Sequence, residues 1–403
     1  RNMGVVAGGL LGGPYVAALT GLIAGIHRAI VNLGRETAIP CAIATTIGGF
    51  LTAYVSRFAK NKDRMKLTVL CDPIGEKMYE TEKIYNKKME KEVSLLKYRD
   101  YKEILSQNKI DIAIISTESG YHEEIGLYFL ENDVNVIIEK PLAMSIEGAQ
   151  RLVDTAKKNN LKLAASHQNR FNYPIQLLKK AIKENKLGKI FNGMARILWT
   201  RDDNYYLQAP WRGTWALDGG TLMNQCIHNI DLINWMMDDE IDTVYAQTSN
   251  YIRNIEAEDY GVILIRYKSG KIATIEGSAI IYPKNLEETL TITGEKGTVV
   301  IGGMAVNKIN TWRVEGDNEE EYLSIDCGDP NSVYGYGHEA LYKDFLDALD
   351  ENREPLVTGK AGLEAVKIIL AAYKSQKTGL PVKFNEFKEF STLDMKENNI
   401  KDR

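Results

Sequence analysis

Hydrophobic and polar positions follow three different patterns along the chain. Residues 3–26 and 37–56 form two uncharged stretches, of 24 and 20 residues. From 66 to 168, short apolar runs alternate with charged segments in which apolar residues recur at helical spacing. Beyond 170, apolar and polar residues alternate along several short runs, as they do in strands with one exposed face. The pattern therefore predicts three regions of different architecture.

The middle region predicts alternating strands and helices. The expected strands are 66–72, 110–117, 134–140 and 161–168, with helices at 76–90, 120–132 and 145–159. Such alternation is typical of an α/β fold with a doubly wound parallel sheet. Ligands bind beyond the carboxyl ends of the strands in these sheets. Here those ends carry Asp72, Ser116–Thr117, Glu139–Lys140 and His167–Gln168.

The last region predicts an α+β domain with a large, mostly antiparallel sheet. The expected strands are 244–250, 261–267, 271–278, 288–293 and 298–301, and closing helices follow at 343–350 and 360–378. We therefore expect four parts: a hairpin over 1–56, a truncated Rossmann-like dinucleotide-binding domain over 57–170, a substrate domain over 171–386 and a polar tail over 387–403. We also expect a homo-oligomer joined through the antiparallel sheet.

The two uncharged stretches predict an apolar helical hairpin. Each is long enough to cross a bilayer core, which needs about 20 residues. Glycines four residues apart would line one helix face and allow close packing in lipid. The basic residues that follow, Arg57, Lys60, Lys62 and Arg64, would hold the downstream body in the cytoplasm. We predict membrane insertion of residues 3–56, with a buried soluble helix or a signal peptide as alternatives.

Composition narrows the classes of function. A net charge of -4 gives no reason to expect nucleic acid as a partner. The four cysteines form no CxxC pair, which argues against a zinc site or a disulfide framework and favours reduced thiols in a cytoplasmic body. Neither HExxH nor GxxxxGK(S/T) occurs, so metalloprotease and P-loop chemistry are not expected. We predict no metal site.

Two strand-end residues carry candidate chemistry. Asp72 could accept hydrogen bonds from the ribose hydroxyls of an adenosine and would repel a 2′-phosphate, although an aspartate before proline also caps helices. Lys140, in EKPLAMS (139–145), would be partly desolvated beside a buried strand. The lower pKa that follows would let the amine exchange a proton with a substrate hydroxyl. An ordinary strand-end ion pair is the alternative for Lys140.

The stretch APWRGTWALDGGTLMNQCIHNIDLINW (209–235) places polar residues on an apolar helix. Asn224 and His228 are four residues apart and would share one helix face. Such a pair needs hydrogen-bond partners, either in the core or on a substrate. The flanking Trp211–Arg212 and Gly219–Gly220 favour a nearby ligand. Arg212 could clamp a carboxylate or phosphate, with a surface ion pair as the alternative.

These segments together resemble one family. CDP, STESGYH, EKPLAMS, HQNRFN, the helix from Gly-Gly to His and YGYGHEALYKDFLDAL are similar to the Gfo/Idh/MocA NAD(P)-dependent sugar oxidoreductases over about 57–384. APWRGTW, LMNQCIHNIDLINW, NLEETLTITGEKGTVVIGG and AVNKI are most similar to its UDP-N-acetylglucosaminuronate 3-dehydrogenase group. Residues 1–56 resemble part of the five-helix membrane module of LytS-type sensors.

The resemblance implies NAD as cofactor and a set of site residues. The cofactor would contact Asp72, Thr117, His122, Glu139, Lys140, Pro141 and Gln168. Lys140 and His228 would be the catalytic residues that move the hydroxyl proton. The substrate, a small-molecule sugar nucleotide, would lie against Arg170, Trp211, Arg212, Asn224 and His228.

Three departures from the family pattern change these expectations. Asn224 stands where many members have an aspartate, and because an amide cannot act as a base, proton transfer falls to Lys140 and His228. Glu118 stands where proline is usual. The family's first strand and glycine-rich loop have no counterpart before Asp72, since no glycines there are spaced i, i+2 and i+5. The stretch CAIATTIGGF (41–50) could substitute for them.

The activity that the resemblance implies is hydride transfer between NAD and C3 of a nucleotide-linked N-acetylated sugar or sugar acid. The hairpin would then anchor a cytoplasmic enzyme. The alternative is a non-catalytic fusion of a membrane-sensor fragment with a dehydrogenase remnant unable to bind NAD, which the missing glycine pattern motivates.

Overall fold

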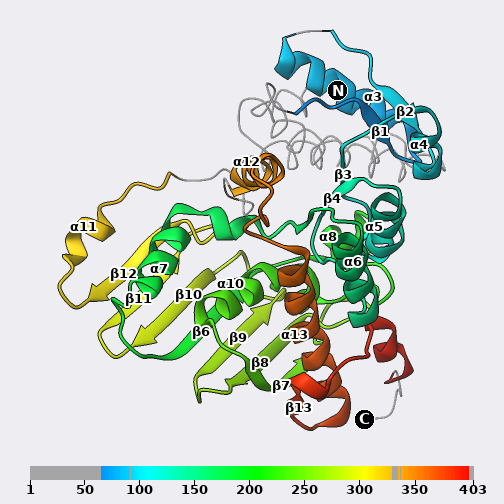
Figure 1. Ribbon diagram of the computed structural model, residues 1–403. Helices are drawn as coiled ribbons and strands as arrows, with labels where there is room; N and C mark the ends of the chain where they lie inside the picture. Colours follow the sequence, from blue (N-terminus) through cyan, green and yellow to red (C-terminus); the bar gives the residue numbers. More distant parts are fainter. Residues whose placement is uncertain (1–64, 91, 329–334, 336, 399–403) are drawn as a thin grey trace. The chain divides into compact units, whose positions relative to one another are not determined.

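The computed structural model describes residues 65–90, 92–328, 335 and 337–398 (Figure 1). These residues fall into two compact units, 65–110 with 335–350 and 111–328 with 351–398. The predicted hairpin over 1–56 and the candidate substitute strand within 41–50 lie outside the described residues. In the part of the chain that is described, no helix is long and apolar enough to cross a bilayer.

The first unit contains a two-stranded parallel sheet. β1 (Val69–Cys71) pairs with β2 (Leu96–Tyr98), and α3 (Gly75–Met89) connects them. Met78, Ile84 and Tyr85 are the buried apolar residues of α3, so one face of an otherwise charged helix is covered, as its periodicity predicts. The unit is completed by η1 (Tyr101–Glu103), α4 (Ile104–Gln107) and α12 (Gly337–Asp350).

The second unit begins with a three-stranded parallel sheet. Its strands are β3 (Ile112–Ile115), β4 (Asn135–Ile138) and β5 (Leu163–Ala165). They lie side by side in the order in which they occur in the sequence. The connecting helices are α5 (His122–Glu131) and α6 (Ile146–Lys158), and α6 begins where the Ser145 side chain accepts a hydrogen bond from the Gly148 amide. β5 is buried throughout and β4 nearly so, as expected of parallel strands covered on both faces.

β1 and β3 belong to different sheets. In a doubly wound sheet, the strand that precedes β1 in sequence would lie between them. Among the described residues no strand pairs with both, and the parallel strands form separate sheets of two and three strands. The single doubly wound sheet expected over 66–168 is therefore not seen among the described residues, whose parallel strands lie in two sheets. The boundaries at 56, 170 and 386 stay predictions, while the compact units divide at 110.

The second unit continues into an eight-stranded mixed sheet. Its order is β12-β11-β10-β6-β9-β8-β7-β13, and every neighbouring pair is antiparallel except β6 with β9. The strands are β6 (Ile190–Leu198), β7 (Ile241–Ser249), β8 (Tyr260–Tyr267), β9 (Ile272–Ser278), β10 (Glu287–Gly294), β11 (Gly297–Gly302), β12 (Lys308–Val314) and β13 (Val382–Lys383). Five of these lie where alternation predicts strands, whereas β6, β12 and β13 were not predicted.

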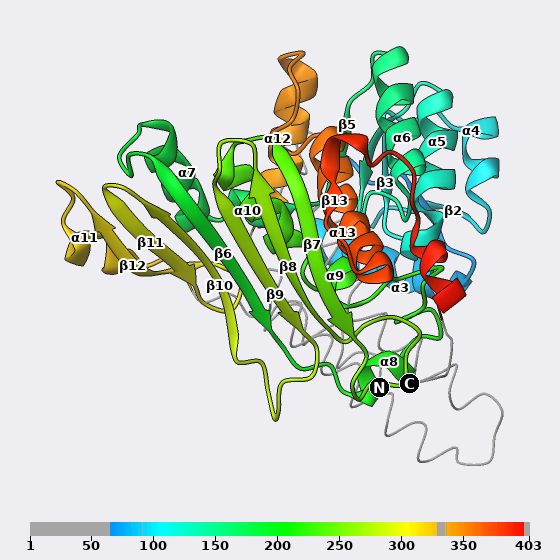
Figure 2. The same ribbon diagram turned by 90° about the horizontal axis from the view of Figure 1, so that it is seen from below.

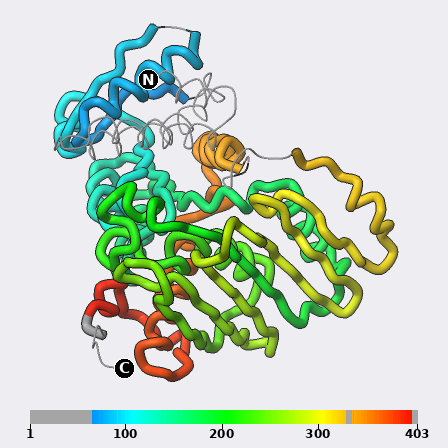
Figure 3. The backbone as a smooth tube through the Cα atoms, turned by 180° about the vertical axis from the view of Figure 1, so that it is seen from behind, coloured from blue at the N-terminus to red at the C-terminus, as the bar shows by residue number. Residues whose placement is uncertain are grey.

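Helices cover one face of this sheet (Figure 2). α10 (Ile227–Met237) packs on β6 and β10, α13 (Gly359–Thr378) on β7, and α7 (Tyr173–Lys183) on β11. Figure 3 follows the same strands from green β6 to yellow β12. Exposed apolar residues on the strands are Phe191, Met194, Val262, Leu264 and Ile272. Self-association through this sheet stays a prediction.

Short elements complete the second unit. They are η2 (Ser119–Tyr121), η3 (Gln168–Phe171), α8 (Asp203–Leu207), α9 (Thr221–Asn224), α11 (Glu319–Leu323), η4 (Phe384–Glu386) and η5 (Thr392–Asn398). Three of them, η3, α8 and α9, carry side chains of the candidate site described next.

Candidate active site

Lys140 lies just past β4 and reaches α9. Its Nζ donates a hydrogen bond to the backbone oxygen of Asn224 at 2.6 Å and to Asn224 Oδ1 at 3.3 Å. Burial lowers the pKa of the Lys140 amine, while Tyr205 and Asp218 act in the opposite direction. The site thus holds an amine that is easier to deprotonate than an exposed lysine.

His228 lies in the first turn of α10. The single helix expected around Asn224 and His228 is interrupted, because α9 ends at Asn224 and α10 begins at Ile227. The His228 ring meets the His167 ring edge-on, 5.6 Å between centroids. Burial lowers the pKa of His228 well below its usual value, and His167 and Lys140 lower it further. Lys140 and His228 therefore share one electrostatic neighbourhood, as the proposed chemistry requires.

His122 supports the segment that carries Lys140. Its Nδ1 lies 2.7 Å from the Pro141 oxygen, and its Nε2 lies 3.1 Å from the Thr117 oxygen. The side chain is fully buried, and burial lowers its pKa. His122 therefore fastens two strand ends, after β3 and after β4, to each other. Glu139 also joins these ends, because its amide donates to the Ile115 oxygen at 2.9 Å.

Arg170 differs from Lys140 in its partner. Its Nε and Nη2 donate to the two carboxylate oxygens of Asp231 at 2.7 and 2.6 Å, and both side chains are buried. The guanidinium also lies 4.8 Å from the Trp235 ring. One edge of Arg170 is thus already bonded within the protein. Its predicted role in substrate binding stays a prediction.

Arg212, on the loop before α9, lies close to two aromatic rings. Its guanidinium carbon is 4.0 Å from the Tyr205 ring centroid and 5.3 Å from that of Trp211. Its buried Nε has no hydrogen-bond partner, and no ion pair forms, among the residues the structure describes. Arg212 lowers the pKa of Lys140, so the two cations are near each other. A half-buried arginine of this kind suits an anionic ligand group.

Asp72 and Thr117 lie at their strand ends with local partners. Asp72 Oδ1 accepts a hydrogen bond from the Ile74 amide at 2.8 Å, and Oδ2 lies 3.4 Å from Lys77 Nζ. Asp72 precedes α3, but the N-cap residue of this helix is Ile74 and no side chain caps it, so the alternative of a helix-capping Asp72 is not confirmed. The Thr117 hydroxyl donates to the Glu118 oxygen at 3.3 Å. Roles in binding the cofactor stay predictions for both residues.

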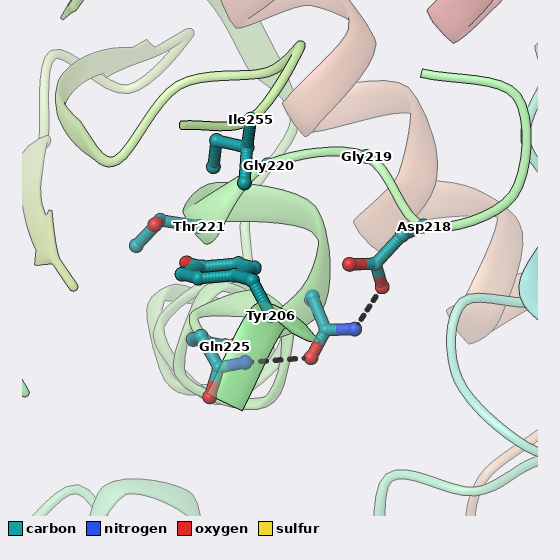
Figure 4. A pocket seen from close by; sticks show the side chains of 8 residues that line it. Tyr206, Asp218, Gly219, Gly220, Thr221, Gln225 and Ile255 are labelled. Carbon is teal, nitrogen blue, oxygen red and sulfur yellow. Dashed lines mark hydrogen bonds between the residues drawn. The ribbon is translucent and has the colours of Figure 1, made fainter. Parts of the chain in front are cut away.

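A small hollow adjoins Asn224, and part of its lining was not predicted. It is lined by Tyr206, Asp218, Gly219, Gly220, Thr221, Asn224, Gln225 and Ile255. Figure 4 shows Asp218 and Gln225 on two sides of one amide group, with a hydrogen bond to each. In the sequence, the pair Gly219–Gly220 was the feature that indicated a close approach at this place. Gly219 has φ +75°, and a Cβ on Gly220 would overlap the carboxylate of Glu258.

Unpartnered buried groups gather at the end of β5. In the described chain, both ring nitrogens of His167, Gln168 Oε1 and Asn169 Oδ1 are buried without a hydrogen-bond partner. Such groups are normally satisfied by protein, water or ligand. They offer donors and acceptors suited to the carboxamide and ribose of a nicotinamide, so the residues present fit that half of NAD. The sequence placed His167 at a strand end where ligands bind but gave it no role, and it did not predict Asn169 as a site residue.

Two domains of one protein family match most of the chain. Residues 179–384 match the Gfo/Idh/MocA oxidoreductase family C-terminal alpha/beta domain, and residues 40–167 match its NAD-binding Rossmann fold. The second match begins before Cys41 and so includes the stretch expected to replace the first strand. Residues 1–71 match the 5TMR domain of the 5TMR-LYT type. The chain belongs to the Gfo/Idh/MocA oxidoreductase family, and its cofactor is NAD.

Similar proteins act on sugars and related polyols. The WlbA dehydrogenase from Bordetella pertussis, solved with NADH and UDP-GlcNAcA, is 31% identical, with 82% of this chain and 94% of that chain covered and a TM-score of 0.72. Myo-inositol 2-dehydrogenase from Thermotoga maritima is 24% identical, covering 72% of this chain and 84% of that protein. The 2,7-anhydro-N-acetylneuraminate hydratase of Escherichia coli is 26% identical over 63% of this chain and 65% of that protein.

Proposed function

We propose that this protein oxidises the C3 hydroxyl of a nucleotide-linked N-acetylated sugar or sugar acid, with NAD as hydride acceptor. The observation that carries the proposal is the Lys140 amine, which burial makes easier to deprotonate and which contacts Asn224 next to His228. The likeness to a WlbA dehydrogenase solved with UDP-GlcNAcA supports the choice of substrate class.

The chemistry assigned to Lys140 is proton transfer. As the C3 carbon becomes a ketone, its O–H proton passes to the neutral amine of Lys140 and its hydrogen leaves as hydride. NAD supplies the acceptor for that hydride. A lowered amine pKa increases the share of neutral Lys140 near neutral pH, which is the form that can take the proton. In the reverse direction the same group, as an ammonium, returns it.

His228 and Arg212 would orient the substrate in this proposal. The neutral His228 imidazole can bond the reacting hydroxyl and help move its proton. The planar guanidinium of Arg212 lies close to the rings of Tyr205 and Trp211 and is well suited to a carboxylate or phosphate. Orientation of this kind lowers the barrier because the reacting atoms are already in place.

The test is a single-turnover reaction of the full chain with NAD and UDP-GlcNAcA. We expect enzyme-bound NADH to form, and the sugar to lose two hydrogens by mass spectrometry. Substrate deuterated at C3 should give deuterated NADH, whereas deuterium at another carbon should not. Transfer from a carbon other than C3 would refute the proposed position, and absence of NADH would refute the reaction.

Matched lysine variants and a binding measurement separate this function from its alternatives. Lys140→Met should slow NADH formation by about 10²- to 10⁴-fold, while Lys157→Met, at an exposed position of α6, should leave it unchanged. Calorimetry tests the alternative of a remnant unable to bind NAD, which the absence of binding heat would support. Water addition without net NADH would point instead to chemistry like that of the hydratase relative.

We also propose that residues 3–56 attach the protein to a membrane, since the match to the 5TMR domain covers them. Expression of the full chain followed by fractionation should place it with membranes, and deletion of 1–56 should release it. Recovery of the full chain in the soluble fraction without detergent would contradict the attachment.

A further inference from the structure

Lys140 is a half-buried lysine whose amine touches no carboxylate among the described residues. Its amine bonds only neutral oxygens of Asn224, and no carboxylate lies within ion-pairing distance of Nζ among the described residues. A buried charge without a nearby opposite charge is costly. The ammonium form, which Lys140 reaches when it takes a proton, therefore depends on charges that lie further away.

The Asn224 amide links Lys140 to that balancing charge. Its Oδ1 accepts hydrogen bonds from Gln225 Nε2 at 2.8 Å and from Lys140, and its Nδ2 donates to Asp218 Oδ1. In the opposite orientation the NH₂ group would face two donors, and the oxygen would face a carboxylate. The hydrogen bonds thus determine which end of the amide faces Lys140.

Asp218 is itself held in place. It is 2% exposed, and its Oδ2 accepts a hydrogen bond from the Gly213 amide at 2.7 Å. Burial raises the pKa of Asp218, while Gly213, Asn224, Arg212 and Lys140 lower it. Asp218 in turn raises the pKa of Lys140. The two groups therefore interact, although one side chain separates them.

We propose that Asp218 is a positioning residue for Lys140: it fixes the Asn224 amide with its oxygen toward the amine and supplies the balancing negative charge across that amide. Asn224 then acts as a spacer between base and carboxylate. Asn224 stands where many family members have an aspartate. In this arrangement Asp218, on the loop before α9, supplies the negative charge that position 224 lacks. The inference rests on the proposed function in taking Lys140 as the group that moves the proton.

Several other titratable or charged groups lie near Lys140. They are Tyr205 on α8, Arg212 on the loop, Glu139 beside it in sequence, His122 on α5, His167 after β5, and Cys226 and His228 at the start of α10. Of these, Tyr205 and Glu139 favour the ammonium, and Arg212 opposes it. Removal of Asp218 should therefore shift the amine toward its neutral form.

The test measures the titration of Lys140 without requiring turnover. The full chain is labelled with a trace of acetic anhydride from neutral to alkaline pH, and acetylation at Lys140 is followed by mass spectrometry. In Asp218→Asn, which keeps the shape and loses the charge, the labelling midpoint of Lys140 should fall by about one pH unit. An unchanged midpoint would overturn the proposal. Because no substrate is used, this outcome is independent of the proposed reaction.

Two further variants isolate the route through Asn224. Glu288→Gln removes another buried carboxyl of the same unit, one whose pKa shift involves neither Asp218 nor Lys140, and should leave the midpoint unchanged. In an Asn224→Ala background, Asp218→Asn should move the midpoint by less than half as much as in the parent. Equal shifts in both backgrounds would overturn the role of the amide. If Asp218→Asn fails to fold, a lowered midpoint in Asn224→Ala alone supports the proposal and an unchanged one opposes it.

Discussion

Lys140 and Arg170 are two buried or half-buried cations of the same unit, and the protein treats them in opposite ways. Arg170 bonds the Asp231 carboxylate directly through two nitrogens, at 2.7 and 2.6 Å. Lys140 bonds the oxygens of an amide, with Asp218 behind it. Arginine stays charged and matches a carboxylate in two parallel bonds, whereas lysine changes its pKa readily when buried.

The difference separates a structural cation from a titratable one. If a directly paired group lost its charge, its partner would be left as an unpaired buried charge. Arg170 and Asp231 therefore stay charged and hold α10 against η3. An indirectly balanced amine retains access to both protonation states, which a group that moves a proton needs. The distance from the cation to its carboxylate, rather than burial alone, distinguishes the structural Arg170 from the titratable Lys140.

The largest effect should come from Lys140→Met. We expect the rate of NADH formation to fall by about 10²- to 10⁴-fold, the usual range for losing a general acid or base. The free energy of unfolding should stay the same or rise, because burial lowers the pKa of Lys140 and the ammonium is a cost to the fold at neutral pH. Single-turnover kinetics and urea unfolding check the two parts. A loss of stability like that of an Arg170 variant would erase the contrast.

Arg170→Met should act on stability. It leaves the 2% exposed Asp231 carboxylate without its partner, which costs about 3–5 kcal/mol for a buried pair. Urea unfolding followed by circular dichroism measures this. The double variant Arg170→Met/Asp231→Leu should recover part of the loss, since no unpaired charge remains. If the single variant unfolds like the parent, the ion pair is not structural.

Arg212 offers a third case, a cation for which no carboxylate partner occurs among the described residues. Arg212→Met should raise KM for UDP-GlcNAcA by about 10- to 100-fold, the loss expected for a hydrogen bond to a charged group. For a nucleotide sugar without the carboxylate, the change should be smaller. Steady-state kinetics on both substrates decide. Equal changes would assign Arg212 to the phosphates, and no change would remove it from the site.

Glu258 is the reverse case, a buried carboxyl with no cation partner in the described chain, and should give the smallest effect near pH 5. It accepts hydrogen bonds from Tyr373 and the Leu222 amide, and burial raises its pKa to about 8. A raised folded pKa gives stability that is present below about pH 4.5 and lost as the pH rises through about 8.

Glu258→Gln removes that dependence. At pH 5 the variant and parent should differ by less than about 0.5 kcal/mol. Toward pH 8 the parent should lose stability faster, by up to about 1.4 kcal/mol per pH unit. Urea unfolding at several pH values checks the slope. Parallel curves would mean that Glu258 is ionised in the folded protein throughout.

Much of the fold follows from local pattern, and its failures have identifiable causes. The strand predicted over 134–140 corresponds to β4 (Asn135–Ile138), because the apolar residues Val136, Ile137 and Ile138 before EKP are buried. β6 was missed because Phe191, Asn192 and Met194 break the alternation on a strand whose exposed side chains are partly apolar. The helix around Asn224 was predicted as continuous, since no residue there marks the interruption at Gln225–Cys226.

The sequence by itself determined the alternation of strands and helices, the lysine after β4, and the polar pair Asn224 and His228, because periodicity and residue chemistry are local properties. Only the tertiary structure decided which charges interact, directly or across a third side chain. Asp218 became the counterpart of Lys140, and Asp231 that of Arg170, across 78 and 61 positions of sequence. Electrostatic energy depends on distance and burial in space, and neither can be read from the order of residues.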